Sequence, residues 1–293
     1  MSNRHTEGRR RIAPGRSIYW QAWLPPNQAS AVIVIVHGFG EHSGRYGHVG
    51  NRLAMSGFAG YAADHRGHGR SDGRRANIER MTLIVADLGG FVQFAIERHP
   101  GLPVFMVGHS LGGLIALQYA LERDVGLDGL VLSAPAVQVT TGSGLQRRLA
   151  RMLSALLPDL QIAALDADQK ISRDPEVIRA YREDPLVYHG RIKARTGAEI
   201  LTTMADLPAR LPQLAIPLLI LHGTDDLICD PAGSAIVHDR VSCTDKTLRR
   251  YRGLYHELFN EPERDEVLTD LIHWLHQHLP RRCAGAAGSR QAE

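Results

Sequence analysis

The sequence predicts an α/β fold, with a mostly parallel central sheet flanked by helices. Short apolar runs rich in branched residues, such as VIVIV at 32–36, are typical of strands buried on both faces of a parallel sheet. These runs alternate with longer segments whose apolar residues recur at helical spacing, which indicates a doubly wound sheet. One segment, 136–212, breaks this alternation and therefore indicates an insertion.

Seven short segments are predicted to be the strands of this sheet. In chain order they are 17–24, 31–36, 60–64, 103–107, 129–133, 217–221 and 247–251. Several are continuously apolar, which fits strands covered by helices on both sides.

Three helices are predicted among and after these strands. Residues 81–98 carry apolar side chains at helical spacing. Residues 111–121 are almost wholly apolar, which predicts a helix in the interior. Residues 263–279 carry an apolar stripe and follow an Asn-Glu-Pro sequence, which is a helix start signal.

The composition is that of an ordinary globular protein and excludes several function classes. The chain has 293 residues, of which 44% are hydrophobic and 22% are charged. Lys+Arg 34 against Asp+Glu 31 leaves a net charge of +3, too small to favour a nucleic acid as the main partner. The longest aliphatic run, 31–36, is too short to span a membrane. Three cysteines make no disulfide framework, so we expect a cytoplasmic protein.

Both ends of the chain are predicted to be disordered tails. Residues 1–16 are polar and basic, with no apolar stretch of the kind a signal peptide needs. Residues 281–293 are rich in Ala, Gly and Ser.

The insertion at 136–212 has helix signals but no good strand, and we expect a helical cap over the carboxyl edge of the sheet. The alternative is a set of extra helices packed on one face. The core then comprises 17–135 and 213–280, with the cap inserted before the strand that leads to a candidate acid. The basic, leucine-rich helix expected at 144–157 either packs within the cap, as most amphipathic helices do, or touches a lipid surface transiently.

The pattern Gly-x-Ser-x-Gly, which forms a nucleophile elbow, occurs twice in the chain. The elbow requires a strand before the serine and a helix after it. Ser110 has both, because it follows strand 103–107 and opens helix 111–121. Ser71 lies in a polar stretch and is predicted to belong to a surface loop. Ser110 is therefore the candidate nucleophile.

A serine needs a base and an acid that orients the base, and in this fold they follow in the order Ser, acid, His. Strand 217–221 ends in His-Gly-Thr-Asp-Asp, which offers Asp225 or Asp226 as the acid. Strand 247–251 is followed by Gly-Leu-Tyr-His, which offers His256 as the base. The other histidines show no ligand spacing, so we expect no metal site.

An oxyanion hole needs backbone N–H groups that are fixed before the charge develops. One is expected from Leu111, directly after the nucleophile. The other is expected from Phe39, whose flanking glycines allow a close approach of the backbone.

Several motifs together resemble the signature loops of the monoacylglycerol lipases, and two of them resemble the mycobacterial members in particular. The segments that carry this resemblance are 37–46 (HGFGEHSGRY), 64–71 (DHRGHGRS), 108–113 (GHSLGG), 171–177 (ISRDPEV), 222–226 (HGTDD) and 253–257 (GLYHE). The likeness runs from about residue 17 to residue 279. It implies an α/β-hydrolase fold, no cofactor, and hydrolysis of the acyl ester of a monoacylglycerol through an acyl-enzyme.

The resemblance also implies roles for individual residues. The family's nucleophile and base match Ser110 and His256, and its acid matches Asp226 rather than its neighbour. The oxyanion amides match Phe39 and Leu111, where the family usually has a smaller residue and Met. Glu41 and Arg45 match positions that the family uses near the glycerol head group. Their alternative role is an ion pair that stabilises the loop.

Three functions follow from these residues. The leading one is cleavage of a monoacylglycerol to a fatty acid and glycerol. A lysophospholipase or general carboxylesterase would share every catalytic residue. A ligand-binding protein that has lost catalysis belongs to a different class, and the complete set of Ser110, Asp226 and His256 argues against it.

Overall fold

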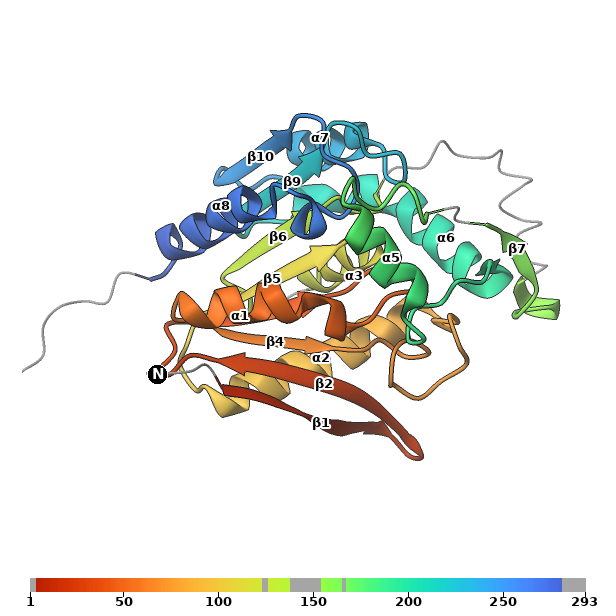
Figure 1. The fold of residues 1–293 in the computed structure, drawn as a ribbon, viewed down its shortest axis with the longest axis horizontal. Helices are drawn as coiled ribbons and strands as arrows, with labels where there is room; N and C mark the ends of the chain where they lie inside the picture. Colours follow the sequence, from red (N-terminus) through yellow and green to blue (C-terminus); the bar gives the residue numbers. More distant parts are fainter. Residues whose placement is uncertain (1–3, 123–125, 138–153, 165–166, 281–293) are drawn as a thin grey trace, which may run out of the picture.

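A computed structural model of the chain describes residues 4–122, 126–137, 154–164 and 167–280. Its centre is an eight-stranded sheet in the order β1-β2-β4-β3-β5-β6-β9-β10 (Figure 1). The pairs β1/β2 and β2/β4 are antiparallel, and all the others are parallel. The strands are β1 Arg4–Ala13, β2 Arg16–Leu24, β3 Val32–Val36, β4 Ala59–Ala63, β5 Val104–His109, β6 Gly129–Ser133, β9 Leu218–Gly223 and β10 Lys246–Tyr251.

Helices cover both faces of the sheet (Figure 1). α1 (Gly47–Met55) and α8 (Arg264–Gln277) pack on one face, and α2 (Met81–Arg98), α3 (Leu111–Ala120) and α7 (Pro231–Arg240) pack on the other. In β3 the side chains alternate between the two layers, since Val34 faces α2 and α3 whereas Ile33 and Ile35 belong to the cluster of α1 and α8. This explains why the strand is apolar at every position. The predicted α/β-hydrolase fold is confirmed.

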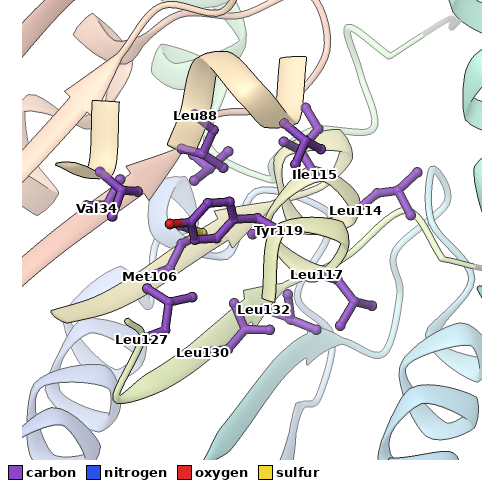
Figure 2. Close-up of a cluster of buried hydrophobic side chains, with 14 of the residues drawn as sticks. Val34, Leu88, Met106, Leu114, Ile115, Leu117, Tyr119, Leu127, Leu130 and Leu132 are labelled. Carbon is purple, nitrogen blue, oxygen red and sulfur yellow. The ribbon is translucent and has the colours of Figure 1, made fainter. Parts of the chain in front are cut away.

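The helix α3 lies in the interior, as its apolar sequence predicts. Every residue from Leu111 to Tyr119 is buried. Figure 2 shows Leu114, Ile115 and Leu117 of this helix against Met106 of β5 and side chains of β6. Because α3 is held from several sides, the residue at its N-terminus is fixed relative to the sheet.

The expectation of a disordered N-terminus is wrong for residues 4–13, which form β1. This strand is antiparallel to β2, with Arg4 opposite Leu24 and Arg11 opposite Ser17. It is an edge strand with only one partner, and none of its side chains is fully buried, so its sequence carries no apolar signal. The salt bridge from Arg9 to Asp72 ties it to the core. The predicted tail at 281–293 lies outside the described residues.

The insertion between β6 and β9 contains α5 (Pro175–Glu183), α6 (Ala194–Arg210) and a two-stranded antiparallel pair of β7 (Gln161–Ala163) and β8 (Ile192–Lys193). The pair β7–β8 corrects the expectation of an all-helical insertion. Most of the helix expected at 144–157 lies outside the described residues, which include a helical turn at 154–156. Three short 3-10 helices, η1 (Ser43–Tyr46), η2 (Leu211–Gln213) and η3 (Leu258–Asn260), complete the described elements.

The insertion docks on loops that follow the carboxyl ends of the strands. The amide of Tyr188 donates to the carbonyl of Gly40, after β3, at 2.7 Å. The amide of Glu257, after β10, donates to the carbonyl of Ile171 at 2.7 Å. These contacts place the insertion over the edge at which the candidate residues emerge, as a cap would lie. Within the described residues, no helix is both long and apolar enough to cross a membrane.

Candidate active site

Ser110 sits in a sharp turn between β5 and α3. Its backbone has φ 53° and ψ −121°, a region that side-chain-bearing residues rarely adopt. The turn is held on both sides, because the amide of Ser110 donates to the carbonyl of Ser133 and its own carbonyl accepts from Gly113 and Ala136. This strained turn between a strand and a helix has the geometry that a nucleophile elbow requires.

The two glycines of the elbow are required by the space around them. A Cβ on Gly108 would lie 2.6 Å from the carbonyl oxygen of Gly112, and one on Gly112 would lie 2.1 Å from that of Val36. Backbone atoms cannot yield to such contacts. The match at 108–112 therefore reflects close packing of α3 against β3 and β5.

Asp226 and His256 meet at the same edge of the sheet. The Nδ1 of His256 is 2.7 Å from Oδ2 of Asp226, and both side chains are buried. The other carboxylate oxygen accepts from the amides of Ile228 and Cys229, at 2.8 and 3.0 Å. Burial alone would raise the pKa of Asp226, but the charge of His256 and these hydrogen bonds outweigh it and hold the pKa below its usual range.

The two alternatives that the sequence offered for acid and nucleophile lie elsewhere. Asp225 is exposed, and its carboxylate accepts from the hydroxyl of Thr224 at 2.8 Å. The hydroxyl of Ser71 donates to the carbonyl of Asp64 at 2.6 Å and accepts from the amide of Tyr19 at 2.8 Å. These two hydrogen bonds join β2 to the loop after β4, so the hydroxyl of Ser71 has a structural role.

A small cavity brings the candidate residues together. It has a volume of about 40 Å³, and its wall includes Ser110, His256 and Phe39 from the core. Residues of the insertion, among them Ile171 and Tyr181, line its other side. A second cavity of about 200 Å³ shares Phe39 and Tyr181 with it. The site thus lies between the loops of the central sheet and the insertion.

The structure brings Glu41 and Arg45 together as a buried ion pair. The Arg45 guanidinium is 2.9 Å from Glu41 and also binds both oxygens of Glu257, at 2.5 and 2.7 Å. Burial would lower the pKa of Arg45, but the two carboxylates outweigh it and raise the pKa above its usual range. Glu41 also accepts from the amide of Gly38 at 2.6 Å. This arrangement fits the alternative role of Glu41 and Arg45, an ion pair that stabilises the loop. Through Glu257, Arg45 links the loop after β3 to the loop of His256.

Three histidines pack under the loop that carries Phe39. The rings of His37 and His65 are 3.9 Å apart, and that of His68 is 5.6 Å from His37. All three are buried, which lowers the pKa of His65 to about 3 and that of His68 to about 4, and that of His37 well below its usual value. The structure therefore holds them neutral.

We expect the protein to lose stability as the pH falls below 6.5. In the unfolded chain these histidines take up protons near pH 6.5, whereas in the folded protein His65 and His68 do so only near pH 3 and 4, and the pKa of His37 lies well below its usual value. The unfolded state then binds more protons in this window, so the free energy of unfolding falls as the pH falls from 6.5 to about 4. Chemical denaturation at a series of pH values measures this slope. His68→Gln should make it shallower, and an unchanged slope would contradict the assignment.

Sequence reasoning missed two residues next to the candidate triad. The thiol of Cys229 lies near Ser110 and Asp226, and burial raises the pKa of this thiol above its usual value. His222 contacts Asp226 with its ring. His222 lies near the end of β9, and Cys229 lies in the loop after it. The only signal in the sequence was that both lie within a few positions of Asp226. The described residues hold no group of three or more His, Cys, Asp or Glu arranged to bind a metal ion.

Comparisons with known proteins show which family the chain belongs to. A family model described as serine aminopeptidase, S33 (Hydrolase_4) matches residues 27–263. A monoacylglycerol lipase of Mycolicibacterium smegmatis is 41% identical over 90% of this chain and 95% of its own. A human monoglyceride lipase is 33% identical over 94% of this chain and 90% of its own.

A solved structure also matches over nearly the whole chain. The monoacylglycerol lipase of Paleococcus ferrophilus superposes with a TM-score of 0.77 at 31% identity, covering 95% of this chain and all of that one. A soluble variant of the Saccharomyces cerevisiae monoglyceride lipase has a TM-score of 0.84 at 24% identity, which supports the fold. The chain therefore belongs to the Hydrolase_4 (serine aminopeptidase, S33) family of α/β-hydrolases, and it is a carboxylic ester hydrolase of that family.

Proposed function

We propose that the protein hydrolyses monoacylglycerols to a free fatty acid and glycerol, with Ser110 as nucleophile, His256 as base and Asp226 as acid. The observation that carries the proposal is the 2.7 Å hydrogen bond between Asp226 and His256, on the same cavity wall as the strained Ser110. The identity with monoacylglycerol lipases of two kingdoms supports this substrate class.

The reaction proceeds in two steps at one centre. The hydroxyl oxygen of Ser110 attacks the ester carbonyl while His256 takes its proton, and His256 then returns that proton to the leaving glycerol oxygen. Water hydrolyses the acyl-enzyme by the same route. The amides of Phe39 and Leu111 donate to the oxyanion. Leu111 suits this role because it is the first residue of α3, whose first N–H groups have no partner within the helix.

The substrate requires more room than the closed site offers. A cavity of about 40 Å³ holds a few waters at most, so the cap moves to admit an acyl chain. The neighbouring cavity of about 200 Å³ adds space on the side of Tyr188 and His189, whose polar groups suit glycerol hydroxyls. Contact of Glu41 and Arg45 with the head group stays a prediction, because both are already paired with protein groups.

We expect monoolein to be hydrolysed at least on the order of a hundredfold faster than triolein in the same detergent micelles. The cap has to move to admit one acyl chain beside Ser110, and two further chains would force it still further from the loop of Gly40. Four added methylenes in that chain should raise kcat/KM by about a hundredfold, since each contributes roughly 0.8 kcal/mol.

A panel of monoacylglycerols, lysophospholipids and simple esters at matched chain lengths tests the substrate class. Preference for the glycerol ester supports the proposal. Equal rates on triolein and monoolein contradict it. A maximum at short chains, independent of the head group, would identify a general carboxylesterase instead.

We also propose that the cap touches a lipid surface. Five large apolar side chains of the described cap are exposed, the most exposed being Leu156 at 76% and Leu157 at 54%. Pro158, next to them, lines a groove of about 480 Å³ whose other walls include Arg74, Arg80 and Arg195. Exposed leucines beside arginines are typical of surfaces that enter the interface of anionic membranes.

Co-sedimentation with vesicles tests this contact. Leu156→Glu should reduce binding to anionic vesicles by on the order of tenfold, because it replaces an inserted leucine by a charge. Met55→Glu is the matched control, since Met55 is equally exposed, at 74%, but lies on α1 of the core. If Leu156→Glu binds like the control and anionic lipid has no effect, the leucines serve packing within the cap.

A further inference from the structure

His222 contacts the same carboxylate oxygen of Asp226 as His256 does. It is fully buried near the end of β9. Its Nε2 lies 3.1 Å from Oδ2 of Asp226 and 3.0 Å from the carbonyl oxygen of Cys229. Its Nδ1 lies 2.6 Å from the hydroxyl of Ser234, a fully buried residue of α7. Every ring nitrogen therefore has a defined partner.

These partners determine where the ring carries its proton. A carboxylate and a carbonyl only accept hydrogen bonds, so Nε2, which faces both, must carry a hydrogen. The hydroxyl of Ser234 is able to donate, and it donates to Nδ1 when the ring is neutral. The chain of hydrogen bonds then runs from Ser234 to His222, and from His222 to Asp226.

The same geometry completes the hydrogen bonding of Asp226. Oδ1 accepts from two backbone amides, and Oδ2 accepts from the rings of His256 and His222 at 2.7 and 3.1 Å. A carboxylate held by four donors is fixed in orientation, and at the oxygen that binds His256 the other donor is the side chain of His222. The hydrogen bond from His222 also helps to hold the pKa of Asp226 low.

We propose that His222 and Ser234 are positioning residues, which hold Asp226 in the orientation that lets it bind Nδ1 of His256. This inference rests on the proposed function, because it assigns Asp226 as the acid. Neither residue reaches the cavity wall, so each acts through Asp226 and not on the substrate.

The first test compares His222→Leu with His222→Gln. Leu removes the donor, and kcat should fall by about 10- to 100-fold with little change in KM, since a charge-assisted hydrogen bond to the acid is lost. Gln keeps an N–H at the end of its side chain and should recover most of the activity. Ser234→Ala should lower kcat less than His222→Leu. Adding it to His222→Leu should cost little more, because the two residues act in series.

The pH profile supplies a readout that general destabilisation would not move. Without the donor, the negative charge of Asp226 acts more fully on protonated His256, so the acidic limb of kcat/KM should shift to higher pH. The other titratable groups near His256 are unchanged in the variant: these are His109, whose ring is 4.7 Å away, Glu257 and Glu41 on the same cavity wall, and Cys229 beside Asp226.

Val237→Ala is the matched control. Val237 is buried on the same helix as Ser234, but it belongs to the apolar cluster. This variant should lower the unfolding temperature without moving the pH limb. If His222→Leu changes only the unfolding temperature, as Val237→Ala does, or if Gln recovers nothing, the inference is overturned.

A measurement on the wild-type protein covers the case in which His222→Leu does not fold. Imidazole ¹⁵N spectra, assigned through His222→Gln, report which nitrogen carries the proton. A hydrogen on Nε2 supports the inference, and a neutral ring protonated on Nδ1 overturns it. Failure of the proposed function is a separate result, in which the wild type hydrolyses no ester and Ser110→Ala changes nothing.

Discussion

Ser110→Ala is expected to lower kcat for monoacylglycerol hydrolysis by roughly a millionfold. The substitution removes the only atom that the proposed mechanism joins to the acyl group. It should leave the fold intact, since the strained turn is held by backbone bonds to Ser133 and Ala136. Steady-state turnover and labelling by a fluorophosphonate probe both measure this loss. Wild-type protein that fails to react with the probe would favour a ligand-binding protein without catalysis.

Ser71→Ala is the matched control, because it removes a hydroxyl from the other Gly-x-Ser-x-Gly sequence, at 69–73. Its hydroxyl bonds only to backbone groups of Asp64 and Tyr19 among the described residues, so the variant should lose about 1 kcal/mol of stability and keep its kcat. Substantial activity in Ser110→Ala, or its loss in Ser71→Ala, would reverse the assignment.

Asp226→Asn is expected to lower kcat by on the order of ten-thousandfold. An amide in place of the carboxylate favours the tautomer of His256 that leaves no lone pair facing Ser110. It also removes the negative charge that stabilises protonated His256. Comparison of initial rates at a pH where His256 is neutral measures the effect.

Asp225→Asn supplies the control for this second prediction. Asp225 is exposed and contacts Thr224, so its change should cost less than a few-fold in kcat. If the two losses are reversed, the acid is the first aspartate of the pair and the proposed hydrogen bond to His256 does not serve catalysis.

The fold was predictable wherever burial dictates residue type. The strand at 32–36 and the helix at 111–121 are apolar at nearly every position because they are covered on all sides, and both lie where the sequence places them. β1 was not predictable, since an exposed edge strand needs only a free neighbouring backbone and no particular side chains. The same holds for β7, whose three residues are exposed.

The candidate site was predictable where a motif fixes the local backbone. The glycines around Ser110 determine the elbow, and strand ends determine where Asp226 and His256 emerge. The role of Arg45 was not decided by sequence, because its main partner, Glu257, lies 212 positions further along the chain. The contacts of His222 were not predictable for a similar reason, because its partner Ser234 lies on a different element, α7.

The two outer strands of the sheet affect how copies of this protein associate in concentrated solution. Open strand edges template aggregation, because another chain is able to continue the sheet. Here both edges are basic. Arg9 of β1 and Arg249 of β10 are paired with Asp72 and Asp270, but β1 also carries Arg4, Arg10 and Arg11, and β10 also carries Lys246 and Arg250. Two molecules that approach edge to edge therefore bring like charges together, and this repulsion keeps the sheet from growing between molecules until salt screens it.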